Sequence, residues 1–120
     1  MASPSSSALA AAPSLGYPVT KKLARNNHTL WKAQVQSALR GAQVAHFLSS
    51  ATPIPPKTVA VKPDTPEDQV PNPDYEVWVA KDQQILNYLF SSLSHDILAQ
   101  VAALPTAATV WEAIEGMFAS

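Results

Sequence analysis

The hydrophobic positions of residues 72–90 recur at helical spacing, and this segment is the longest amphipathic stretch of the chain. It opens with an Asn-Pro pair followed by acidic residues, which is typical of an N-cap, a first helical position and a first turn. Asp82 interrupts the apolar stripe one turn after Trp78. The pattern therefore predicts a long helix that buries one face and carries a carboxylate on that face.

The carboxylate of Asp82 needs a partner if it is buried, because an unpaired charge in a protein interior costs several kcal/mol. We expect the indole N–H of Trp31 or Trp78 to be that partner. A basic residue of the first helix, Lys32 or Arg25, is the other candidate. Our hypothesis is that Asp82 pins the long helix against the helix around Trp31. The alternative is that Asp82 lies half-exposed at the edge of the stripe.

Three shorter helices are predicted around the long one, each from a capping residue followed by apolar positions at helical spacing. The glycine after the first helix could end it or kink it, since an apolar pattern resumes beyond it. A proline stops the second. The three segments are residues 28–40, which Trp31 anchors, 95–103 and 107–118.

The apolar stripe of the last helix includes Ile114, Met117 and Phe118 and runs to the end of the chain at Ser120. We expect the sequence to continue beyond Ser120, and we expect these three residues to form an association surface. The glutamates of this helix, including Glu115, lie away from the stripe, so the pattern predicts a solvated face for them. A solvated position is also expected for the histidines that fall in helix first turns.

The remaining segments do not show helical periodicity. Residues 1–20 are rich in Ser, Ala and Pro and are predicted to form a disordered leader. Residues 49–73 hold seven of the eleven prolines and are predicted to form a long Pro-rich loop, in which 58–61 is the only candidate strand. The sequence thus predicts an all-α domain over residues 21–120, a small bundle of four to five short helices.

The charges divide the chain into two halves. Residues 1–62 contain seven of the eight basic residues and no acid, a charge of +7; residues 63–120 contain nine acids and one lysine, a charge of −8. The two halves could attract each other within one molecule or join copies of the chain head to tail. A third interpretation is non-specific RNA binding by the basic half. The candidate contacts are Lys21, Lys22, Arg25, Lys32 and Arg40.

The sequence contains no recognisable catalytic or metal-binding motif. The chain has no cysteine, and its three histidines have no metal-ligand spacing. No nucleophile–base set or phosphate-binding glycine loop is recognisable. We therefore expect no enzymatic activity, no cofactor, no metal and no small-molecule substrate. The sequence has neither a membrane-spanning run nor a secretory signal, and its Ser/Ala-rich start only weakly resembles a transit peptide, so we expect a cytoplasmic location.

Five short motifs follow one another along residues 21–120. The first runs from Leu23 to Trp31 and reads L-x-x-x-N-[YH]-x-x-W, and the second is the Leu-Arg-Gly-Ala stretch of residues 39–42. The others resemble W-x-x-x-D, L-x-x-S-L-S and T-A-x-[ED]-[VA]-W. In this order they resemble the Gag polyprotein of plant copia-type LTR retrotransposons. The motif residues are Leu23, Asn27, Trp31, Trp78, Asp82, Leu89, Ser92 and Trp111.

The resemblance implies the N-terminal part of a capsid-forming protein, in a truncated copy. Thr109 stands where the family has an acid that completes a capping box, so we expect a weaker cap. The family continues to a Cys-rich zinc knuckle that binds RNA, which a chain without cysteine does not contain. The expected function is self-association or packing against further Gag helices. The alternatives are RNA binding, and a degenerate remnant without a selected function.

Overall fold

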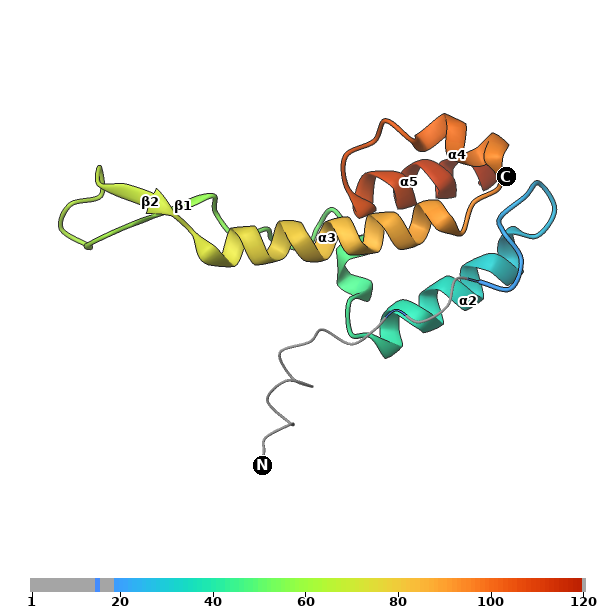
Figure 1. Ribbon diagram of the computed structural model, residues 1–120, viewed down its shortest axis with the longest axis horizontal. Coiled ribbons are helices and arrows are strands. Elements are labelled where there is room, and N and C mark those ends of the chain that lie inside the picture. The colour runs from blue at the N-terminus through green and yellow to red at the C-terminus, as the bar shows by residue number, and fades with distance from the viewer. Residues whose placement is uncertain (1–14, 16–18, 120) are drawn as a thin grey trace, which may run out of the picture.

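The computed structural model describes residue 15 and residues 19–119 (Figure 1). The predicted leader falls largely outside these residues; Leu15 and Val19 pack against the core. Among the described residues there are four α-helices, one 3₁₀ turn and one two-stranded sheet, so the all-α prediction is confirmed. The elements are α2 (His28–Gly41), η1 (Ala45–Leu48), β1 (Thr58–Ala60), β2 (Gln69–Pro71), α3 (Pro73–Ser91), α4 (His95–Val101) and α5 (Ala107–Phe118).

Helix α3 begins and ends within one residue of the predicted segment. The Asn72 side chain caps it by accepting a hydrogen bond from the backbone N–H of Asp74 at 3.0 Å. The C-terminal half of α3 buries Ile85 and Leu89 in the core. Its N-terminal half extends out of the helical body, so that α3 forms the long axis of the molecule (Figure 1).

The Pro-rich segment contains a short hairpin, of which the sequence pattern predicted only the first strand. Strands β1 and β2 pair antiparallel, with Val59 opposite Val70, and form a hairpin at the far end of α3 (Figure 1). The candidate strand at residues 58–61 is therefore real, and its partner lies just before α3. The rest of the segment is irregular, as expected for a Pro-rich loop, and Pro71, at the end of β2, is the only one of its prolines that lies in a strand.

Helix α2 ends in a turn that reverses the chain toward η1. The backbone N–H of Val44 donates to the carbonyl oxygen of Leu39 at 2.9 Å, and that of Gln43 donates to Arg40 at 3.0 Å. These two bonds form a Schellman motif, whose left-handed position is usually glycine. Here Gln43 occupies it with φ 63°, while Gly41 stays helical.

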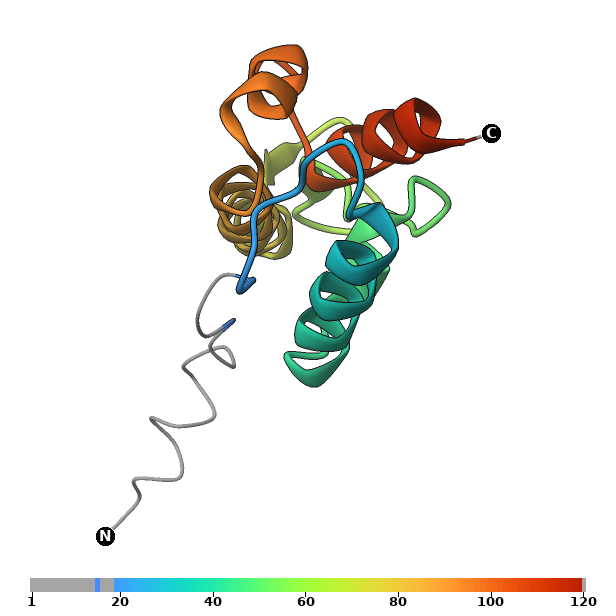
Figure 2. The same cartoon turned by 90° about the vertical axis from the view of Figure 1, so that its right-hand side faces the viewer.

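The core lies where α2, α4, α5 and η1 surround the C-terminal half of α3. Figure 2, which looks nearly along α3, shows α2 on one side of it and α4 and α5 on another. The segment before α2 completes the core, because Leu23 pairs with Leu93 as an isolated parallel bridge. The largest fully buried apolar side chains are Trp31, Leu23, Leu39, Ile85, Leu89, Leu93 and Ile114.

Candidate functional site

Ser92, directly after α3, is the meeting point of three distant segments. It is fully buried, and its carbonyl oxygen accepts hydrogen bonds from the backbone N–H of Leu23 at 2.8 Å and from the indole N–H of Trp31 at 3.1 Å. The Ser92 hydroxyl also lies 3.1 Å from that indole nitrogen and donates to the carbonyl of Leu89 at 2.6 Å. Four of the motif residues therefore form one buried cluster, which we call the Ser92 cluster.

Asn27 stabilises the turn before α2. Its side-chain oxygen accepts a hydrogen bond from the backbone N–H of Ala24 at 2.8 Å, and its amide donates to the carbonyl of Lys22 at 3.0 Å. The side chain makes no capping hydrogen bond to α2, although Asn27 occupies the N-cap position. This motif residue thus fixes the path of the chain from Leu23 into the helix that carries Trp31.

Trp31 also joins α2 to α5. Its ring stacks on that of Trp111, with centroids 5.5 Å apart and an interplanar angle of 25°. Both rings are buried. Offset stacking of this kind adds to the stabilisation that the burial of two large rings supplies.

Asp82 is buried, and its two hydrogen bonds go to α5 and to its own helix rather than to α2. One carboxylate oxygen accepts a hydrogen bond from the backbone N–H of Ala107 at 3.2 Å, and the other accepts one from the side chain of Gln83 at 3.3 Å. The expectation that Asp82 pins α3 to the helix around Trp31 is wrong, because Asp82 faces the first residue of α5. The half-exposed alternative is also wrong, since Asp82 is 1% exposed.

Burial raises the pKa of the Asp82 carboxyl above its usual 3.8. The hydrogen bonds from the Ala107 N–H and the Gln83 amide act in the opposite direction but do not outweigh it. A buried acid with a raised pKa is a common feature of functional sites, yet both oxygens of Asp82 are engaged in structural bonds.

Trp78 contacts η1. Its ring stacks on Phe47 with centroids 5.6 Å apart. Trp78 and Phe47 line a mainly apolar cavity of about 220 Å³ between η1, α3 and the start of α5. Asp82 and Ile54 also line this cavity. The two residues of the W-x-x-x-D motif therefore dock α3 on two different elements, η1 and α5.

Thr106 and Thr109 form a complete capping box at the start of α5. The Thr106 hydroxyl accepts a hydrogen bond from the backbone N–H of Thr109, and the Thr109 hydroxyl accepts one from the N–H of Thr106, both at 3.1 Å. The box is therefore complete in geometry with threonine in place of the acid, while its lower strength stays a prediction, because a neutral hydroxyl lacks the charge of a carboxylate.

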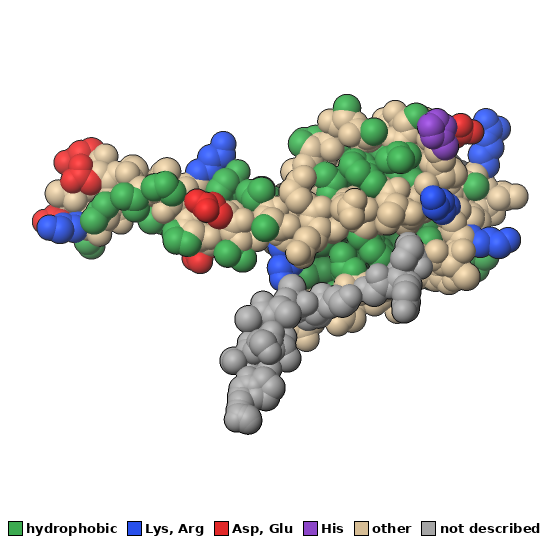
Figure 3. Space-filling view, in the orientation of Figure 1, with side chains coloured by type: hydrophobic (Ala, Val, Ile, Leu, Met, Phe, Trp, Pro, Cys, Tyr) green, Lys and Arg blue, Asp and Glu red, His purple; other side chains and the backbone are tan. Residues whose placement is uncertain are grey.

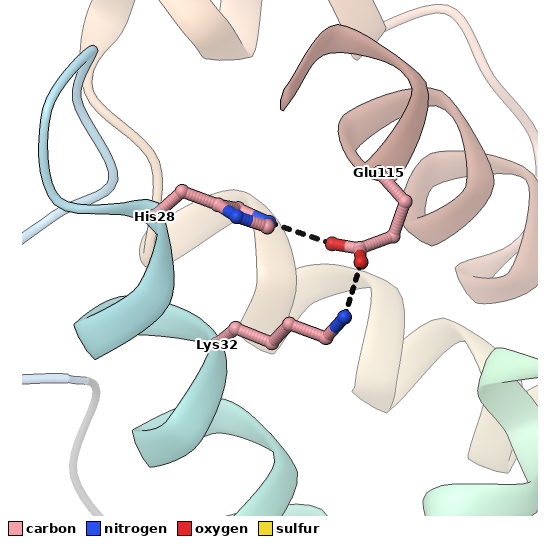
Figure 4. Close-up of polar contacts among 3 residues, drawn as sticks. All are labelled: His28, Lys32 and Glu115. Carbon is pink, nitrogen blue, oxygen red and sulfur yellow. Dashed lines mark hydrogen bonds and ion pairs between the residues drawn. The ribbon is translucent and has the colours of Figure 1, made fainter. Parts of the chain in front are cut away.

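Glu115 joins α5 to α2 through an ion-pair cluster (Figure 4). His28 Nε2 lies 2.7 Å from one carboxylate oxygen, and Lys32 Nζ bonds the other. The expectation that Glu115 and His28 are solvated is wrong, since α2 crosses the polar face of α5 and leaves both partly buried. Burial alone would raise the pKa of the Glu115 carboxyl, but the hydrogen bonds and charges of Lys32 and His28 lower it below 4.5.

The expected association surface on α5 is largely closed. Ile114 is completely buried in the core, so that part of the prediction is wrong. The Phe118 ring stacks on His28 with centroids 4.6 Å apart and is only partly exposed. Met117 remains 37% exposed. Because α2 covers this end of α5, the apolar stripe is mostly used within the fold.

The predicted nucleic-acid contacts do not form one group. Lys32 is bound to Glu115, and Arg40 lies about 18 Å from the start of α2 along its axis. Lys21, Lys22 and Arg25 lie together before α2 and are exposed. Within the described ranges, none of these three cations is in an ion pair.

The described part of the chain contains no group of three histidine or acidic side chains that could hold a metal ion. None of the described helices has the length and apolar character needed to cross a membrane.

Comparison with curated proteins identifies plant relatives of this chain. It is 33% identical over 101 residues to the retrovirus-related Pol polyprotein from transposon RE2 of Arabidopsis thaliana, and 31% identical over 101 residues to that from transposon RE1. The chain is homologous to retrotransposon polyproteins. The alignment covers 82% of this chain but only 6% of each relative. No protein-family profile and no solved structure matches the chain.

This homology confirms the retrotransposon part of the expected resemblance and its plant character. The relatives are polyproteins, and the chain spans a small segment of them. The role of that segment is therefore a separate question.

Proposed function

We propose that this chain is a Gag-like, copia-type helical module of a retrotransposon, a capsid-type protein that acts through self-association and has no catalytic activity. The Ser92 cluster is the observation that carries this proposal. The four motif residues of this cluster lie up to 69 positions apart, from Leu23 to Ser92, yet they meet in one buried core. The motif residues are therefore used to pack the core, as expected if the shared property of these chains is a fold with a structural role.

The use of the buried polar groups supports a structural role. Among the described residues, the buried polar or charged side chains are Asn72, Asp82 and Ser92. Asn72 caps α3, Asp82 bonds the start of α5, and Ser92 holds Trp31. A catalytic group needs atoms that can reach a substrate, whereas these atoms are engaged inside the protein.

Light scattering on the purified chain tests the proposal. We expect oligomers whose mass rises with protein concentration up to about 100 μM and falls when salt is added. A monomer throughout, at low and at high salt, would contradict the proposal.

RNA binding is the second candidate function, and one observation favours it. Lys21, Lys22 and Arg25 are exposed and close in sequence, and none of them forms an ion pair within the described residues. A titration with single-stranded RNA tests this candidate, because binding through these cations must weaken steeply as salt rises. Absence of binding at about 50 mM salt would remove it.

A further inference from the structure

The hairpin and the start of α3 form an arm that extends away from the helical body. We define the arm as residues 54–77. All six residues of β1 and β2 are exposed. The arm lies at one end of the long axis of the molecule, and the segment that leads into α2 lies at the other end (Figure 1).

The arm carries an apolar face that the described part of the chain does not cover. Val59 and Val70 are cross-strand partners and are 37% and 41% exposed. Val61, on the same face as Val59, is 57% exposed. Figure 3 shows hydrophobic side chains running along the arm. Exposed apolar residues that cluster on a sheet face are typical of an interaction surface.

The arm is also acidic. It contains five acids and two lysines, a net charge of −3. Three of the acids fall in the hairpin loop, where Figure 3 shows acidic side chains gathered at the tip. A partner for this face should therefore combine positive charge with an apolar contact.

The opposite end of the molecule has this combination. Leu30 on α2 is 73% exposed, the most exposed large apolar side chain of the described residues. Leu30 and Lys21 line a hollow of about 110 Å³, together with Thr20 and Gln34. Lys22, which follows Lys21 in the chain, is also exposed, and residues 19–53 contain five basic residues and no acid. We call this surface the basic hollow.

We infer that the arm of one copy docks on the basic hollow of a second copy, with Val59 and Val70 against Leu30 and the hairpin acids against Lys21 and Lys22. The two surfaces lie at opposite ends of one molecule, so they meet only between molecules (Figure 1). Such a contact is heterologous and joins copies head to tail, into rings or open chains. The inference rests on the proposed self-association and names its surfaces.

Sedimentation velocity of the full chain and five variants tests the inference. Glu67→Lys/Asp68→Lys reverses the sign of two charges on the arm, and Lys21→Glu/Lys22→Glu reverses the sign of two charges at the basic hollow. We expect each double variant to associate at least roughly tenfold more weakly than the wild type. The variant with all four changes keeps the wild-type net charge of −1, because the two changes to lysine add +4 and the two changes to glutamate add −4. This variant should associate like the wild type.

Arg40→Glu is the matched control for Lys21→Glu. Each changes the net charge from −1 to −3, but Arg40 lies at the far end of α2. We expect Lys21→Glu to weaken association and Arg40→Glu to leave it unchanged. Circular dichroism of every variant checks that the exposed substitutions leave the fold intact.

The outcomes separate this inference from the proposed function. If the wild type associates and neither double variant is weaker, or the fourfold variant is not restored, the docking surfaces are wrong while self-association stands. A wild-type chain that never associates overturns both. If Lys21→Glu/Lys22→Glu removes RNA binding without changing association, the hollow is a nucleic-acid contact and the docking inference is wrong.

Discussion

The carboxylate of Asp82, in the middle of α3, accepts a hydrogen bond from the backbone N–H of Ala107, the first residue of α5. This N–H is one of the groups that a helix leaves unpaired at its N-terminus. A negative charge at this end is also favoured by the helix dipole. Asp82 thus determines where α5 begins against α3.

Replacing Asp82 with alanine should lower the free energy of unfolding by about 2 kcal/mol, because the Ala107 N–H would be buried without a partner. Asp82→Asn should lower it less, since the amide oxygen can still accept the bond and no charge is buried. Urea denaturation measures both. Asp64→Ala, at an exposed position of the hairpin loop, is the control and should change stability little. Equal effects of the three substitutions would contradict this role.

The two shifted carboxyls should give pH dependences of opposite sign. Glu115 has a lowered pKa, so its contribution to stability is present above the usual 4.5 and is lost as pH falls through the folded-state pKa. Asp82 has a raised pKa, so its charge destabilises the fold as pH rises from the usual 3.8 through the folded-state pKa. Urea denaturation across this acid range measures both pH dependences. Glu115→Gln should remove the loss of stability at falling pH, and Asp82→Asn should remove the loss of stability at rising pH.

The magnitude expected for Glu115 is modest. Its side chain is 28% exposed and that of Lys32 is 37% exposed, so solvent screens the pair. We expect Glu115→Gln to lower the free energy of unfolding by about 0.5–1 kcal/mol at neutral pH, and less at high salt. Glu76→Gln, on the exposed start of α3, is the control. An effect of Glu115→Gln that does not respond to salt would contradict the ion-pair account.

Substituting Ser92 with alanine should destabilise the core by about 1–2 kcal/mol. The change removes the hydroxyl that lies between the Trp31 indole and the Leu89 carbonyl, while the backbone bonds of Ser92 remain. Thermal melts followed by tryptophan fluorescence measure the loss. Ser94→Ala is a matched control, because the Ser94 side chain makes no capping bond to α4. A similar loss in both variants would show that the hydroxyl of Ser92 has no special role.

Gln43→Gly should stabilise the protein by up to about 1 kcal/mol. The left-handed backbone of Gln43 is unfavourable for a residue with a Cβ, and glycine removes that strain at the expense of a more flexible unfolded chain. Differential scanning calorimetry should therefore show a higher melting temperature. Gln43→Ala keeps the strain, so it should not raise the melting temperature; if both changes raise it equally, strain at this position is not the cause.

The helices could be predicted from sequence because their signals are local. In α3, the capping Asn72, the proline after it and the apolar spacing all lie within the segment that becomes the helix. The same holds for α5, where Thr106 caps and the stripe follows at once. The N-terminal end of each helix was therefore predicted closely.

The partners of the polar residues could not be predicted, because they depend on which elements meet. Asp82 is on the apolar face of α3 by periodicity, but periodicity does not reveal that α5 begins above it. Glu115 is on the polar face of α5, and only the path of α2 brings His28 and Lys32 to it. The second strand of the hairpin was missed because three residues are too short to show a period.

The position of the partners of Trp31 has a consequence for synthesis of the chain. Its indole bonds Ser92, 61 positions later, and its ring stacks on Trp111 near the end of the chain. Helix α2 is complete on the ribosome long before either partner is made, so its apolar face must wait in contact with water or a chaperone. Folding of this domain is therefore expected to wait until α5 has been made, and nascent chains that end before α5 should be sensitive to protease.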